Sequence, residues 1–123
     1  MIILHGFTNG SVIMESVMEM LCDKYWCVAI DLRGHGYSSY NTKITSIKDM
    51  AIDINLFIKE VLKVNEIYLL GHSMGSAVAM ELSLLMPSKV KKLVLVSSIF
   101  DKGWKVKNPD TELNSIEQLK EPE

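Results

Sequence analysis

Apolar and polar residues alternate in blocks along this chain, and the blocks have the lengths of strands and helices. Apolar-rich runs of strand length lie at residues 1–4, 26–30, 67–70 and 90–96. Between them, apolar residues recur every three or four positions, which predicts helices over about 11–24, 47–62 and 74–86. Strands alternating with helices favour an α/β fold, an open parallel sheet of about four buried strands with helices on both faces.

The second helix has the clearest start signal. Ser46 is followed three residues later by Asp49, which resembles a capping box although Asp is shorter than the usual Glu. Pro87 marks the end of the third helix, because proline cannot continue the backbone hydrogen-bond ladder.

Composition excludes several classes of function. The chain has 123 residues and a formal net charge of −2, so we expect one small domain without the basic surface of a nucleic-acid-binding protein. No apolar run is long enough to cross a membrane, and we expect no secretion signal, because the first four residues have no basic region before them and His5-Gly6 directly after them. Cys22 and Cys27 fit no metal-ligand spacing. We therefore expect a cytoplasmic protein with no metal site and no nucleic-acid or membrane partner.

The segment Gly71-His72-Ser73-Met74-Gly75 lies between a predicted strand and a predicted helix. This is the G-x-S-x-G pattern of a nucleophile elbow, in which a tight turn exposes the serine hydroxyl above the sheet. Two other interpretations exist for a serine or a glycine-rich turn here. One is a helix N-cap. The other is a dinucleotide-binding turn, but Ser73 stands where that motif needs its second glycine.

Three segments in the right order make the chain resemble the α/β-hydrolase superfamily, in its serine-nucleophile esterase/lipase-like branch. They are His5-Gly6-Phe7, the stretch Asp31-Leu32-Arg33-Gly34-His35-Gly36-Tyr37-Ser38, and the elbow. The resemblance implies Ser73 as the nucleophile and the backbone N–H groups of Phe7 and Met74 as the oxyanion hole. It also implies elbow glycines at Gly71 and Gly75, no cofactor, a small-molecule acyl substrate, and the strand order second, first, third, fourth.

A serine nucleophile needs a histidine base and usually a carboxylate. The three histidines of the chain are His5, His35 and His72. Each lies in a motif that does not contain the catalytic histidine in the family. Asp101 is the only acid at a plausible position after the last strand, although a solvated surface charge is the commoner role for such a residue.

We therefore expect the N-terminal half of a hydrolase: residues 1–98 as a partial core, and 99–123 as a polar tail or the start of a missing cap region. Two alternatives stay open. The chain is a non-catalytic fragment or binding module that retains the elbow, or an acyltransferase, C–C hydrolase or lyase of the same fold. The expected partners are a second polypeptide that supplies the missing half, or further copies that associate through sheet edges at 26–30 and 90–96.

Overall fold

The computed structural model describes residues 1–7, 10–40 and 46–98. Its strands are β1 (Ile2–Leu4), β2 (Val28–Ile30), β3 (Ile67–His72) and β4 (Val90–Val96). They pair in parallel in one sheet with the order β2-β1-β3-β4. Both the predicted fold class and the predicted strand order are confirmed.

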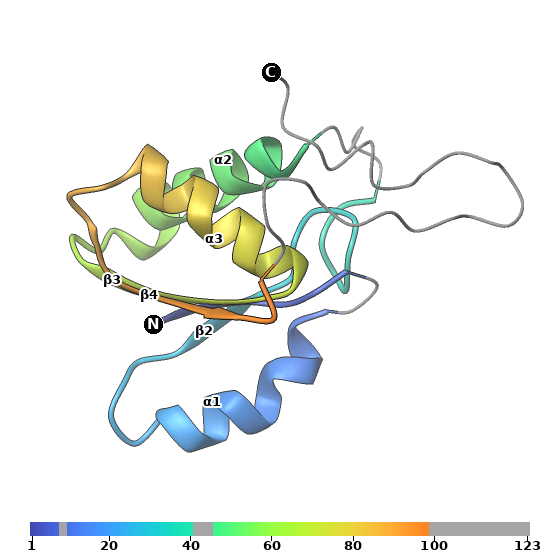
Figure 1. Cartoon of the computed structure of the whole chain (residues 1–123), viewed down its shortest axis with the longest axis vertical. Helices are drawn as coiled ribbons and strands as arrows, with labels where there is room; N and C mark the ends of the chain where they lie inside the picture. The colour runs from blue at the N-terminus through green and yellow to red at the C-terminus, as the bar shows by residue number, and fades with distance from the viewer. Residues whose placement is uncertain (8–9, 41–45, 99–123) are drawn as a thin grey trace, which may run out of the picture.

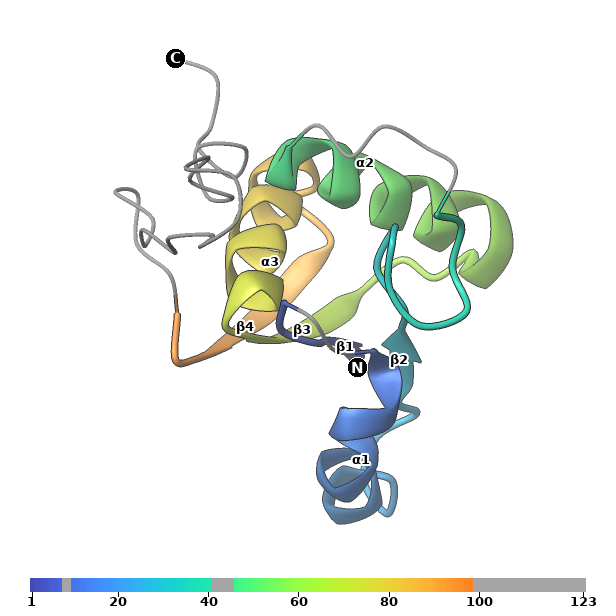
Figure 2. The same ribbon diagram turned by 90° about the vertical axis from the view of Figure 1, so that its right-hand side faces the viewer.

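The helices cover the two faces of the sheet, as Figures 1 and 2 show. A short 3₁₀ turn, η1 (Ser11–Met14), leads into α1 (Glu15–Leu21) on one face. On the opposite face lie α2 (Ile47–Phe57), which ends in the π-helical turn η2 (Ile58–Leu62), and α3 (Met74–Leu85). The expected helices on both faces are thus present.

The core is divided unequally between these faces. The larger cluster fills the space between the sheet and the α2–α3 pair, whereas the cluster under α1 contains only Ile3, Met14 and Leu70 among its buried members. None of the residues of α1 itself is fully buried. Most of the free energy of apolar burial therefore comes from the α2–α3 side.

The expectation that all strands are buried is wrong for β4. Residues 91–96 are exposed, because β4 is an edge strand and no described helix covers its end on the α1 face. An open apolar hollow of roughly 330 Å³ remains there, lined by Ile13, Met14, Val17, Leu70, His72 and Val96. The predicted sheet edges at β2 and β4 are confirmed.

Element boundaries differ from the prediction by two or more residues at three elements. The first helix begins with a 3₁₀ turn and ends at Leu21, three residues before the predicted end. Strand β2 starts at Val28, because its pairing partner in β1 starts at Ile2 and Trp26 lies beyond that point. Strand β3 continues to His72, where it meets the elbow. The predicted tail or cap entry at 99–123, which includes Asp101, lies outside the described residues.

Candidate active site

Ser73 occupies the junction between β3 and α3 in a strained backbone conformation. Its φ is 53° and its ψ is −117°, in a region that residues other than glycine rarely adopt. The backbone on either side is firmly bonded, since the Ser73 N–H donates to the Val96 carbonyl (2.9 Å) and the Ser76 N–H donates to the Ser73 carbonyl (2.9 Å). The strain is therefore imposed by the surrounding fold.

The N-cap interpretation of Ser73 is wrong. A capping serine has an extended backbone, and its side-chain oxygen accepts a hydrogen bond from the first turn of the helix. Ser73 has a positive φ, and its side chain makes no capping hydrogen bond. Ser46 at the start of α2 provides the contrast, because its φ is −159° and its Oγ accepts from the Asp49 N–H at 3.2 Å.

The two glycines of the elbow are required by close backbone contacts. A Cβ added to Gly71 would lie 2.3 Å from the carbonyl oxygen of Gly75. A Cβ added to Gly75 would lie 2.4 Å from the carbonyl oxygen of Leu4 and 2.6 Å from that of His5. Real Cβ atoms do not approach backbone oxygens so closely, and the elbow is consequently packed directly on the end of β1.

The loop after β1 lies against the elbow. A Cβ added to Gly6 would lie 3.3 Å from the Cβ of Ser73 and 3.1 Å from Nδ1 of His72. The next residue, Phe7, is 40% exposed, whereas the Met74 side chain is fully buried. Met74 is the first residue of α3, where backbone N–H groups have no acceptor within their own helix. The structure thus brings the Gly6–Phe7 segment and the start of α3 together around Ser73.

His5 is completely buried and both of its ring nitrogens are bonded. Nε2 lies 3.0 Å from the Leu32 nitrogen and Nδ1 lies 2.7 Å from the Gly6 carbonyl oxygen. Because the Leu32 N–H is a donor, Nε2 accepts, and Nδ1 carries the proton and donates to Gly6. Burial lowers the pKa of His5 below its ordinary value of 6.5, with a smaller contribution from His35 in the same direction. The hydrogen bond to Gly6 and the charge of Asp31 oppose this shift.

The other two histidines also lie in the structural surroundings of the site. Nδ1 of His35 is 3.0 Å from the Arg33 carbonyl oxygen. The centroid of the His35 ring lies 5.1 Å from that of the His5 ring and 6.0 Å from that of the Phe7 ring. Nδ1 of His72 is buried with no hydrogen-bond partner among the described residues. Within that part of the chain, no histidine is hydrogen-bonded to the Ser73 hydroxyl.

The Asp31–Ser38 loop is held in place by hydrogen bonds to the Asp31 carboxylate. The Asp31 carboxylate accepts from the Ser11 N–H (2.6 Å) and from the Tyr37 N–H (2.9 Å), and these bonds lower the pKa of Asp31 below 3.8. Gly36 has a φ of +53°, and a Cβ there would overlap the Asp31 carboxyl group at 2.2 Å. This loop therefore joins the end of β2 to the start of η1.

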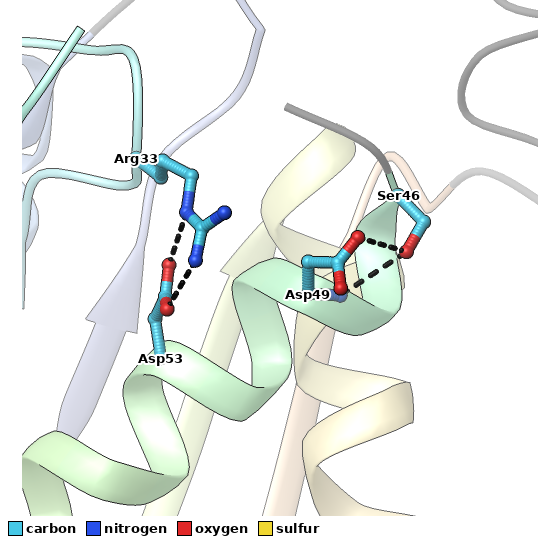
Figure 3. A network of polar contacts seen from close by, with 4 residues as sticks. All are labelled: Arg33, Ser46, Asp49 and Asp53. Carbon is cyan, nitrogen blue, oxygen red and sulfur yellow. Dashed lines mark hydrogen bonds and ion pairs between the residues drawn. The ribbon is translucent and has the colours of Figure 1, made fainter. Parts of the chain in front are cut away.

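A second polar network joins the same loop to α2 (Figure 3). The Arg33 guanidinium binds the Asp53 carboxylate with two bonds, Nε to Oδ2 at 2.7 Å and Nη2 to Oδ1 at 2.6 Å. At the start of α2 the Ser46 hydroxyl donates to Oδ2 of Asp49 at 2.8 Å. The predicted cap at Ser46 is confirmed by the bond from the Asp49 N–H to the Ser46 Oγ. The Asp49 carboxylate adds a second bond, which it accepts from the Ser46 hydroxyl.

Two classes of site find no support in the described ranges. These ranges contain no group of three or more His, Cys, Asp or Glu residues that could hold a metal ion. They also contain no helix with the length and apolar character needed to cross a bilayer.

Comparison with known proteins finds relatives that share this architecture. A family model described as the alpha/beta hydrolase fold matches residues 1–119. Over 96 residues, 78% of this chain, the sequence is 34% identical to the dihydrolipoyllysine-residue acetyltransferase component of the acetoin cleaving system of Cupriavidus necator. The same share of the chain is 31% identical to 2-(acetamidomethylene)succinate hydrolase of Mesorhizobium japonicum.

Solved structures agree with these sequence relationships. The structure of a marine microorganism esterase superposes with a TM-score of 0.75 and 31% identity over 90% of this chain. The matched regions make up only part of these proteins, namely 25% of the acetyltransferase component, 34% of the Mesorhizobium hydrolase and 41% of the esterase. The chain thus spans about a quarter to two fifths of the length of the relatives it matches.

Proposed function

This chain belongs to the alpha/beta hydrolase fold family, whose model matches residues 1–119, and we propose that it carries the nucleophile and oxyanion hole of a serine hydrolase acting on an ester, thioester or similar acyl substrate. The observation that carries the proposal is the strained backbone of Ser73, with φ 53° and ψ −117°, at a strand-to-helix turn. Such strain persists only where the fold enforces it, and it occurs preferentially at functional sites.

In the proposed reaction, Oγ of Ser73 attacks the carbonyl carbon of the acyl substrate while a base takes the hydroxyl proton. The carbonyl oxygen becomes an oxyanion, which the N–H groups of Phe7 and Met74 stabilise. The position of Met74 at the start of the 12-residue helix α3 supports this role, because the helix dipole favours negative charge there. Collapse of the tetrahedral intermediate expels the alcohol or thiol, which takes the proton back, and water then releases the acid from Ser73.

The assignment of an acyl substrate rests on the serine. A serine nucleophile forms an acyl ester that water can hydrolyse, and the esterase and the Mesorhizobium hydrolase among the relatives carry names that fit hydrolysis. The acetyltransferase component shows that related sequences also occur in proteins named for acyl transfer. A transferase differs only in the acceptor that attacks the acyl-serine, so the proposed roles of Ser73, Phe7 and Met74 hold for either reaction.

The base and its carboxylate partner are proposed to lie outside the described residues. Both ring nitrogens of His5 are bonded, and Nδ1 of His35 is next to the Arg33 carbonyl. Residues 1–123 alone should therefore react slowly. In a serine protease of known mechanism, loss of the base costs on the order of a million-fold in turnover.

The test is labelling of Ser73 by a fluorophosphonate probe, together with hydrolysis of p-nitrophenyl butyrate. Residues 1–123 alone should show no more signal than the Ser73→Ala variant. Addition of a polypeptide that contains the later strands of the domain, with their acid and histidine, should restore both signals. Ser83→Ala is the matched control, because Ser83 lies in α3 away from the elbow, and it should keep the restored signal.

Two outcomes would contradict the proposal. Labelling that survives Ser73→Ala would place the nucleophile at another residue. Absence of any signal from a folded, reconstituted complex would favour the alternative of a binding module that retains the elbow without chemistry.

A further inference from the structure

The buried imidazole of His5 connects two loops that the chain places far apart. His5 follows β1 directly, while Leu32, whose N–H donates to Nε2, lies in the loop after β2. The other nitrogen, Nδ1, donates to the carbonyl oxygen of Gly6 at 2.7 Å. A buried polar ring with both nitrogens bonded fixes the positions of the groups it contacts, because breaking either bond leaves an unsatisfied buried group.

The bond to Gly6 has a consequence for the next residue. The carbonyl of Gly6 and the N–H of Phe7 belong to one planar peptide group, in which they point in opposite directions. A donor that holds the Gly6 oxygen therefore also sets the direction of the Phe7 N–H. Gly6 itself lies against Ser73, so this peptide group borders the nucleophile.

We propose that His5 is a positioning residue for the oxyanion hole: its neutral, Nδ1-protonated ring, fixed by the Leu32 N–H, holds the Gly6 carbonyl and thereby aims the Phe7 N–H at the site above Ser73. The use of that N–H as an oxyanion donor rests on the proposed function. The orientation of the peptide group by His5 does not.

The surroundings of His5 keep the ring neutral. The titratable groups that face it in the described structure are His35 and Asp31 from the loop after β2, and His72 borders the Gly6 side of the loop. Burial dominates and lowers the pKa of His5 below 6.5. Protonation would turn Nε2 from an acceptor into a donor that faces the Leu32 N–H, which is also a donor. The hydrogen bond from Leu32 that fixes the ring would then be lost. The positioning should therefore fail in acid.

Two variants separate the two bonds of the ring. In His5→Asn the amide nitrogen takes the place of Nδ1 and retains the donor to Gly6, but no acceptor reaches Leu32. In His5→Gln the longer side chain places an oxygen near the Nε2 position and retains the acceptor for Leu32, but not the donor to Gly6. The readouts are the ring-nitrogen shifts of His5 and the backbone amide signals of Phe7 and Leu32, recorded by NMR on residues 1–123.

We expect the wild-type ring to show the neutral tautomer with the proton on Nδ1 at pH 7.5. His5→Asn should leave the Phe7 amide shift near the wild-type value and speed hydrogen exchange at Leu32 by about tenfold, as for the loss of one ordinary hydrogen bond. His5→Gln should do the reverse, shifting the Phe7 amide and sparing Leu32. In the reconstituted enzyme, His5→Gln should lower kcat by about tenfold or more at a similar KM, because a misdirected oxyanion donor weakens the transition state.

A ring protonated on Nε2, or a Phe7 amide that responds to neither variant, would overturn the inference. The tautomer is measured on the wild-type chain and so decides the matter even if a variant does not fold. Ser73→Ala should abolish the activity of the reconstituted enzyme but leave the tautomer of the His5 ring unchanged, so failure of the proposed function and failure of this inference are distinguishable.

Discussion

The backbone strain at Ser73 can be measured by replacing the residue with glycine and with alanine. Both substitutions remove the hydroxyl, which caps no N–H group of α3. They differ in the freedom of the backbone, because glycine adopts a φ of 53° without steric cost and alanine does not. The difference in free energy of unfolding between the two variants therefore reports the strain.

Its expected size follows from two opposing effects. A non-glycine residue in a sparsely populated backbone region costs about 1–3 kcal/mol. Glycine also increases the freedom of the unfolded chain, which costs about 0.4–1 kcal/mol. The balance leaves Ser73→Gly more stable than Ser73→Ala by about 1 kcal/mol, or about 4 °C in Tm for a chain of 123 residues.

The assay is urea unfolding followed by circular dichroism, with the same pair of substitutions at Ser83 as the control. Ser83 lies within α3, where glycine is less favourable than alanine by about 1 kcal/mol, so the sign there should be opposite. If Ser73→Gly is no more stable than Ser73→Ala while the Ser83 pair behaves as expected, the strain is absent and the main support for the nucleophile is lost.

Three further predictions concern packing, pH and association. Gly75→Ala should cost about 3 kcal/mol or prevent folding, seen as loss of helical circular dichroism, because its Cβ would meet the Leu4 carbonyl at 2.4 Å. The free energy of unfolding should decrease as the pH falls below 6.5, because the pKa of His5 is lower in the folded chain than in the unfolded chain, which therefore binds more protons in this pH range. A wild-type urea midpoint that is equal at pH 7.5 and pH 5.5 would contradict this. Residues 1–123 should elute as oligomers at high concentration through the exposed edge at β4, and Val94→Lys should shift the profile toward monomer, whereas a monomeric wild type would exclude this association.

Much of the architecture could be predicted from local pattern. The apolar spacing over 47–62 marks the second helix, and Ser46 marks its start, because both signals arise from residues a few positions apart. The elbow could also be predicted from the sequence, since Gly71, Ser73 and Gly75 meet within one turn of the chain. The strand order needed the family resemblance, because periodicity does not say which strands are neighbours.

Features that depend on distant contacts could not be read in advance. The bond from Leu32 to His5 joins residues 27 positions apart, and the carboxylate of Asp31 caps a turn 20 positions earlier in the chain. No spacing rule connects such residues, and each histidine or aspartate has many possible roles. The exposure of β4 was missed for a similar reason. An apolar strand sequence indicates that the strand packs against another element, but it does not tell whether that element lies among the residues that the structure describes.

The contacts around Ser73 also divide the proposed chemistry into two parts. The strain at Ser73, the packing of Gly75 on the Leu4 carbonyl and the bonds of His5 involve the ends of β1 and β3, the start of α3 and the loops after β1 and β2. These are backbone contacts or contacts to the backbone, so under the proposed function they would fix the position of the oxyanion before any proton moves. Proton transfer has no counterpart among them. In the proposed reaction, a histidine delivered to the Ser73 hydroxyl would therefore meet backbone groups that these contacts already hold in place, and reconstitution should restore chemistry without refolding the elbow.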